Sequence, residues 1–145
     1  MAKKGYVDEK HVGISGHSYG GYMSGYALTH GKVFTAGIAS GPVTDWALYD
    51  SIYTERYMGL PSENRKGTAI FRHRRGQNLH GKLMIMHGMI DDNVHVQNSM
   101  QLIDALEQAN KPFEMMVYPR NRHGIGGPHS LADAAGFHPA GDGGG

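Results

Sequence analysis

One serine of the chain lies in a pattern that is typical of an enzyme nucleophile. The motif G-x-S-x-G spans residues 16–20, with Ser18 at its centre. An apolar, β-branched run (11–17) precedes Ser18 and a run of helical period (19–31) follows it, so Ser18 falls where a strand ends and a helix starts. Because the chain contains 22 glycines, the motif alone is weak evidence, and this context supports the interpretation.

The residues around Ser18 also fit a site where negative charge develops. We expect Gly16 and Gly20 to relieve crowding in the sharp turn. The helix that begins after Ser18 would direct its N–H groups and positive end toward the same point, so an oxyanion could be held there. Ser15 and Ser24 fall inside the strand and the helix, where a hydroxyl more often bonds the local backbone.

A serine needs a base, and two suitable residues follow later strands. Asp91 comes after the apolar run 82–88, and His123 comes after the run 112–119. Parallel strands assemble sites at their carboxyl ends, and the order Ser, Asp, His is that of an α/β-hydrolase triad. His123 would then take the proton of Ser18, and Asp91 would fix the imidazole tautomer. The alternatives are an Asx turn at Asp91 and a surface-loop position for His123.

The elements that must position these residues alternate along the chain. Short runs rich in apolar residues predict four strands: 11–17, 34–42, 82–88 and 112–119. Apolar or aromatic residues at helical spacing predict three helices: 19–31, 44–59 and 96–110. This order predicts an α/β fold with about four parallel strands flanked by helices.

Two segments do not fit this alternation. Residues 68–77 are basic and lack an apolar period, so we expect a solvated loop. Residues 126–145 are dominated by Gly, Ala and Pro, and we expect this tail to be mostly disordered. The catalytic part would therefore be a partial α/β-hydrolase domain over residues 1–125.

Composition excludes several classes of function. Lys and Arg number 14 and Asp and Glu 13, for a net charge of +1, so no nucleic-acid or membrane partner is indicated. Cysteine is absent, and the ten histidines show no H-E-x-x-H spacing, so we expect neither a metal nor another cofactor. The sequence contains no signal-like segment and no apolar run of membrane-spanning length. We expect a soluble chain of undetermined compartment.

Four segments resemble the catalytic domain of the prolyl oligopeptidase family, closest to its dipeptidyl peptidase IV branch: 18–22 (SYGGY), 49–59 (YDSIYTERYMG), 87–95 (HGMIDDNVH) and 123–125 (HGI). The resemblance runs from about Gly5 to Ile125, with an interruption at 68–77. The family's β-propeller and the first half of its hydrolase sheet have no counterpart here, so the chain looks like a C-terminal partial domain.

The resemblance implies roles for particular residues. It makes Ser18 the nucleophile, Asp91 and His123 its partners, and the Tyr19 N–H an oxyanion donor. It also implies a pocket for a proline or alanine side chain, lined by Tyr19, Val43, Trp46, Tyr49, Tyr53, Asn93 and Val94. Without the resemblance, an aromatic stripe at helical spacing is more often part of a core.

Two hypotheses of function follow. The first is a serine hydrolase that cleaves post-proline peptide bonds or small esters through an acyl-enzyme. The second is a catalytically silent fragment, or an interaction remnant of a dipeptidyl peptidase. Because the preceding half of the sheet is missing, the strand over 11–17 would have an unpaired edge, and we expect homo-oligomers that form through it.

Overall fold

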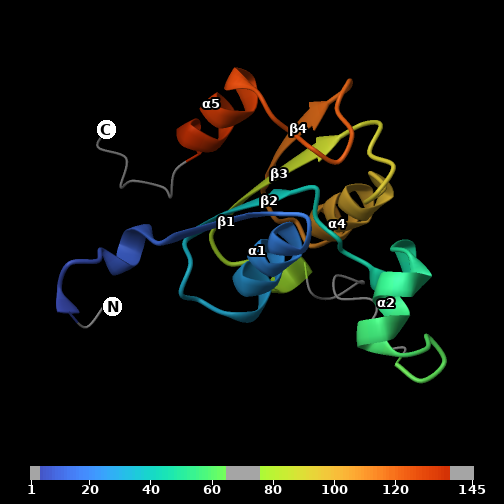
Figure 1. Ribbon diagram of the computed structural model, residues 1–145. Coiled ribbons are helices and arrows are strands. Elements are labelled where there is room, and N and C mark those ends of the chain that lie inside the picture. The colour runs from blue at the N-terminus through green and yellow to red at the C-terminus, as the bar shows by residue number, and fades with distance from the viewer. Residues whose placement is uncertain (1–3, 65–75, 138–145) are drawn as a thin grey trace.

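The computed structural model describes residues 4–64 and 76–137, and its sheet has four parallel strands (Figure 1). The strands lie side by side in sequence order: β1 (Gly13–His17), β2 (Ala36–Ser40), β3 (Lys82–Gly88) and β4 (Glu114–Tyr118). Each pairs in parallel with the next, so all four carboxyl ends lie at one edge of the sheet. The expected class, a partial α/β-hydrolase fold with four parallel strands and flanking helices, is confirmed.

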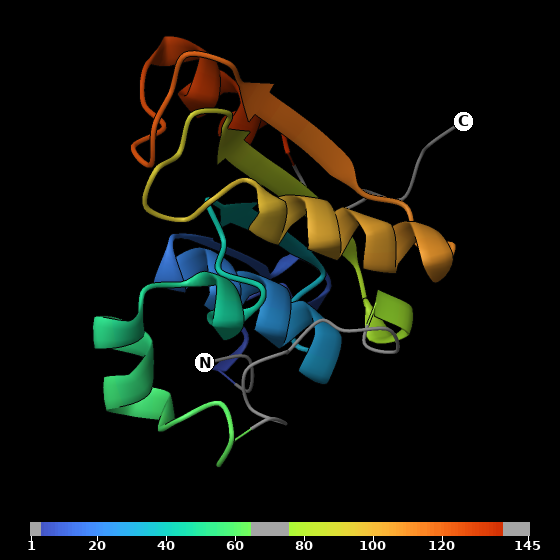
Figure 2. The same ribbon diagram turned by 90° about the vertical axis from the view of Figure 1, so that its right-hand side faces the viewer.

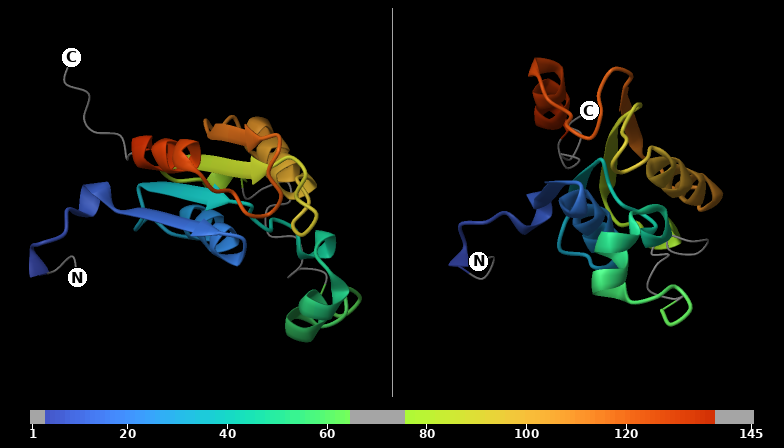
Figure 3. Two further views of the ribbon diagram at one scale, coloured as in Figure 1. Left: turned by 45° about the horizontal axis from the view of Figure 1, so that its top comes forward. Right: turned by 45° about the vertical axis from the view of Figure 1, so that its right-hand side comes forward.

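Helices cover the two faces of the sheet unequally. Within the described residues, α1 (Tyr19–His30) and α4 (Gln97–Gln108) lie on one face and α5 (Pro128–Gly136) on the other (Figures 2 and 3). The main core lies under α1 and α4, where Leu28, Leu102 and Leu106 are at most 1% exposed. On the sheet side the same core contains Ala39, Leu83 and Ile85.

The central position of β3 explains its composition. Six of its seven residues are buried, because β2 and β4 flank it and helices cover both of its faces. β1 differs, because it pairs only with β2 among the described residues and alternates between exposed and half-buried positions. Its first expected residues are not strand: Glu9–His11 form a 3-10 turn that the Asp8 side chain caps.

The segment 44–59, expected to be one helix, consists of two elements. A 3-10 turn, η3 (Trp46–Leu48), is followed by α2 (Ser51–Met58). The break has a local cause: the Asp45 carboxylate accepts a hydrogen bond from Ala47 N–H at 2.9 Å, and Asp50 accepts one from Tyr53 N–H at 2.8 Å. Two capping aspartates therefore start two helical elements in place of one.

The structure also differs from the expected tail, because part of it is helical. Helix α5 begins with Pro128 in its first turn. Proline is tolerated there because an N–H at that position would have no acceptor within the helix. The Tyr118 hydroxyl donates a hydrogen bond to Asp133 at 2.6 Å and ties α5 to β4. The remaining tail residues 138–145 lie outside the described residues. So does most of the expected basic loop, residues 68–75, whereas Gly76–Asn78 form a 3-10 turn, η4.

Candidate active site

Ser18 lies on a strained turn between β1 and α1. Its backbone has φ 60° and ψ −118°, a conformation that is uncommon for any residue except glycine. The Ser18 N–H donates to the Ser40 carbonyl at 2.8 Å, which fixes the turn against the end of β2. Ser18 is also the N-cap residue of α1, but its side chain makes no capping hydrogen bond. The hydroxyl is directed elsewhere.

Two glycines make this turn possible, and only one of them is in the expected pair. A Cβ at Gly16 would lie 2.4 Å from the backbone of Gly20, and a Cβ at Gly21 would lie 2.6 Å from the Ser40 carbonyl. A Cβ at Gly20 would meet nothing within 4 Å. The expected steric role of Gly20 is therefore wrong, and Gly21 has it instead, because α1 passes close to the end of β2.

The hydroxyl of Ser18 is at one end of a hydrogen-bonded chain of three side chains. Ser18 Oγ lies 2.8 Å from His123 Nε2, and His123 Nδ1 lies 2.8 Å from Asp91 Oδ2. The three residues follow β1, β4 and β3, so the shared carboxyl edge brings them together. Because an ionised Asp91 can only accept, Nδ1 carries the imidazole proton and Nε2 is left to accept from Ser18.

Asp91 is held on both of its oxygens. Its Oδ1 accepts hydrogen bonds from the N–H groups of Asn93 at 3.0 Å and Val94 at 2.9 Å. The Asx turn, which the sequence offered as an alternative, therefore coexists with the contact to His123. Gly88 permits this arrangement, since a Cβ there would lie 2.2 Å from the Arg122 carbonyl. The loops after β3 and β4 can thus approach closely enough for Asp91 to reach His123.

A second histidine packs against His123. The rings of His17 and His123 have centroids 4.6 Å apart, and His17 Nδ1 lies 3.0 Å from Ser40 Oγ. Burial lowers the pKa of His17, and the neighbouring His123 lowers it further. A neutral His17 places no competing cation beside the base. The sequence interpretation missed this residue, although its place directly before Ser18 in the motif could have indicated it.

The residues expected to line a pocket form two groups. Trp46 stacks on Tyr53 with ring centroids 5.9 Å apart, and the Tyr49 hydroxyl donates to Asn93 Oδ1 at 2.9 Å. Tyr19, the residue after Ser18, has its ring 6.0 Å from that of Trp46. Val43 and Val94, with 2% and 0% exposure, are core residues, and Trp46, which is 5% exposed, belongs to the same core. Five of the seven therefore make an aromatic and polar wall beside Ser18, and two support it from below.

The structure adds residues to this wall. A hollow is lined by Tyr19, Tyr22, Trp46, Tyr53, Tyr57 and Met58. Tyr22, Tyr57 and Met58 were not expected there. Two signals were present in the sequence: Tyr57 lies one helical turn after Tyr53, and Tyr57 and Met58 fall in the segment 49–59 that carries the family resemblance.

Among residues 4–64 and 76–137, no group of three or more His, Cys, Asp or Glu residues could hold a metal ion. Over the same residues, no helix has both the length and the apolar character needed to cross a membrane.

The chain belongs to the prolyl oligopeptidase family, whose profile matches residues 1–137. It is 44% identical over 128 residues to "Probable dipeptidyl-aminopeptidase B" of Tuber melanosporum, covering 85% of this chain and 14% of that protein. It is 45% identical over 129 residues to the protein of the same name in Neurospora crassa, and this match covers 86% of this chain and 14% of that protein. The chain thus spans about a seventh of the length of these relatives.

Solved structures give the same result. The crystal structure of Porphyromonas gingivalis dipeptidyl peptidase 4 matches with a TM-score of 0.82 at 44% sequence identity. The match covers 90% of this chain and 19% of that one. The relatives are serine peptidases of this family, and the fold described here corresponds to part of their catalytic α/β-hydrolase domain.

Proposed function

We propose that the chain is a serine hydrolase that acts through the triad Ser18, His123 and Asp91, on post-proline peptide bonds or small esters. The observation that supports this most is the pair of 2.8 Å contacts that link Ser18 Oγ to His123 and His123 to the Asp91 carboxylate. The strained backbone of Ser18 is a second support, because such strain is concentrated at functional positions.

The proposed reaction proceeds in two halves. Ser18 Oγ attacks the substrate carbonyl carbon while its proton passes to His123 Nε2, and Asp91 stabilises the imidazolium. The oxyanion is held by the N–H of Tyr19, the first residue of α1, whose initial N–H groups have no acceptor within the helix. The tetrahedral intermediate expels the alcohol or amine, which takes the proton from His123. Water then releases the acyl group by the same steps.

The aromatic wall supports a small apolar group next to the scissile bond. Trp46, Tyr49 and Tyr53 pack edge to face or stacked, and flat rings of this kind suit a compact side chain such as that of proline or alanine. The names of the relatives, which are dipeptidyl peptidases, favour the same choice. Asn93, which is fixed by the Tyr49 hydroxyl, would offer a polar contact beside this group.

The second candidate is a silent fragment, and one observation favours it. The chain spans only 14% of the length of the curated relatives, so most of the length of those proteins lies outside the match. Loss of one oxyanion donor costs about a hundredfold to a thousandfold in rate. Small activated esters need less of this stabilisation than peptides. We therefore expect ester turnover to exceed peptide turnover.

Turnover of p-nitrophenyl acetate and of alanyl-proline p-nitroanilide tests the proposal. The wild-type chain should hydrolyse the ester, and Ser18→Ala should reduce its rate to the level of the buffer. Ser15→Ala and Ser24→Ala are matched controls, since both remove a serine hydroxyl close to Ser18 in sequence. They should keep most of the activity. An inert wild-type chain would favour the silent fragment.

A further inference from the structure

A fourth side chain contacts the carboxylate of Asp91. His87, near the end of β3, is 0% exposed, and its Nε2 lies 3.2 Å from Asp91 Oδ2. This is the same oxygen that lies 2.8 Å from His123 Nδ1. Oδ2 of Asp91 is therefore flanked by two imidazole rings, one from β3 and one from the loop after β4.

The surroundings of His87 determine where its proton lies. His87 Nε2 is 2.8 Å from the Val94 carbonyl oxygen, which can only accept, so Nε2 carries the proton. His87 Nδ1 then accepts from the Ser99 hydroxyl at 2.6 Å. Ser99 lies on α4 and is 0% exposed. Asp91, His123 and His17 are the titratable groups that face this cluster.

Electrostatics agrees with a neutral ring at this position. Burial lowers the pKa of His87, while the Val94 carbonyl and the Asp91 carboxylate partly oppose the shift and His123 adds to it. His87 is thus a neutral N–H donor over the pH range in which a histidine base works.

We propose that His87, oriented by Ser99, is a positioning residue whose Nε2–H is shared between the Val94 carbonyl at 2.8 Å and Asp91 Oδ2 at 3.2 Å, and that this contact keeps Oδ2 directed at His123. The inference rests on the proposed function, because it concerns the base of that triad. It extends the chain of polar contacts to Ser99–His87–Asp91–His123–Ser18, from α4 to the nucleophile.

The consequence of losing this donor has a definite sign. The Asp91 side chain is fully buried, so each oxygen needs its donors. Without the N–H of His87, the negative charge on Asp91 Oδ2 is less neutralised. The carboxylate then stabilises the protonated form of His123 more strongly. The acid limb of kcat/KM should then move to higher pH, and kcat should fall because Asp91 is held less firmly.

Three variants test the proposal with the ester substrate, with rates divided by the titrated number of active sites. His87→Met removes the donor at similar volume and should lower kcat about tenfold, with the acid limb moved to higher pH. His87→Gln keeps an N–H near the position of Nε2 and should recover most of both. Ser99→Ala weakens the donor indirectly and should shift the limb in the same direction, by less.

Ser24→Ala is the matched control for Ser99→Ala. Both serines are 0% exposed and lie on helices, but the Ser24 hydroxyl donates to the Gly20 carbonyl of its own helix at 3.0 Å. Ser24→Ala should cost stability and leave the acid limb in place. If His87→Met and Ser99→Ala lowered only the melting temperature and left the acid limb unmoved, the positioning role would be refuted.

A spectroscopic measurement separates this inference from the proposed function. In protein labelled with ¹⁵N-histidine, His87 should be the neutral Nε2–H tautomer, and Ser99→Ala should shift the resonances of both His87 and the His123 Nδ1 proton. If His87 were the Nδ1–H tautomer, or if His123 did not respond to Ser99→Ala, the inference would fail. An inert wild-type enzyme that gives the expected spectra would contradict the proposed function alone.

Discussion

The carboxyl edge of the sheet and the outer edge of β1 differ in how completely they are supported. At the carboxyl edge, Ser18, His123 and Asp91 are linked by 2.8 Å contacts, and Asp91 has donors on both oxygens. β1 is the edge strand of the described sheet: Gly13 and Ser15 are exposed, and among the described residues a strand, β2, pairs with β1 on its inner side alone. The site is therefore the more constrained of the two regions.

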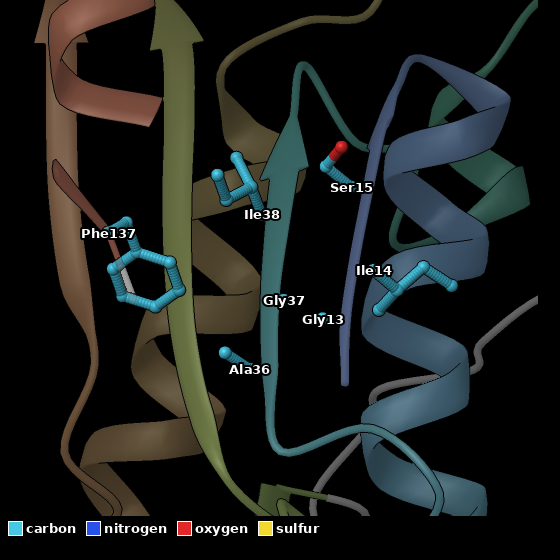
Figure 4. A pocket seen from close by; sticks show the side chains of 7 residues that line it. All are labelled: Gly13, Ile14, Ser15, Ala36, Gly37, Ile38 and Phe137. Carbon is cyan, nitrogen blue, oxygen red and sulfur yellow. The ribbon is translucent and has the colours of Figure 1, made fainter. Parts of the chain in front are cut away.

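The sheet face next to β1 shows the same contrast. On the side away from α1, a hollow runs over β1 and β2, with Ser15, Ile38 and Phe137 among its lining residues (Figure 4). Ile14 also lines this hollow, but its side chain extends toward α1 in the figure. The triad needs only the ends of β1, β3 and β4, whereas cover for β1 must come from other segments. The geometry of the triad therefore depends on different segments from those that would cover the outer edge of β1.

The largest effect should come from Asp91→Asn. The amide can donate to His123 Nδ1 and so favours the wrong tautomer, and we expect ester turnover to fall at least about a thousandfold. Asp92→Asn is the matched control, because Asp92 is exposed and pairs with the exposed Arg122, a contact of little energetic value. Similar rates for the two variants would contradict the role of Asp91.

The outer edge of β1 should affect the oligomeric state of the chain. We expect the isolated chain to form homo-oligomers through β1, because an edge strand with one side unpaired, and with neither proline nor lysine on it, recruits another strand. Ser15→Lys, at the centre of β1, should shift the chain to monomer in sedimentation velocity, and Ser15→Ala should not. A monomeric wild-type chain that does not respond to Ser15→Lys would show that this edge is covered.

A moderate effect is expected from Tyr118→Phe, which frees α5 from β4. Loss of the hydrogen bond to Asp133 should cost about 1 kcal/mol and lower the melting temperature by a few degrees. Burial, with a smaller effect of Asp133, raises the pKa of Tyr118 to about 12. Stability from this phenol is therefore full below pH 10, its unfolded pKa, and is lost as pH approaches 12.

Tyr6→Phe is the control, since Tyr6 is 65% exposed. It should melt as the wild type does. A loss of stability above pH 10 of the same size in the wild type and in Tyr118→Phe would mean that another group causes it.

The smallest effect is a loss of folding stability at acidic pH. The pKa values of His87 and His17 are both lowered, chiefly by burial, so the unfolded chain binds more protons once pH falls below the ordinary value of 6.5. Stability from both residues is complete above that pH and is lost below it. Urea unfolding at pH 7.5 and 5.5 measures this, and His17→Phe should reduce the difference. Equal stability at both pH values would exclude the effect.

The sequence was enough to predict features that depend on the order of the elements and on the spacing of apolar residues. The four strands follow from apolar runs, and the neighbourhood of Ser18, Asp91 and His123 follows from placing each residue after a parallel strand. The features it missed are tertiary or local competitions. The break after Trp46 depends on the caps at Asp45 and Asp50, helix α5 depends on the distant Tyr118, and the contact of His87 with Asp91 depends on a turn that no periodicity indicates.

Covalent labelling with a fluorophosphonate tests the central claim most directly, because the reagent reacts with an activated serine and does not require turnover of a peptide substrate. Intact mass and peptide mapping should show one adduct per chain, on Ser18, that is absent from Ser18→Ala and forms far more slowly in Asp91→Asn. A folded chain that gains no adduct, or that gains one on another serine, would contradict the assignment of Ser18, His123 and Asp91 as a working triad.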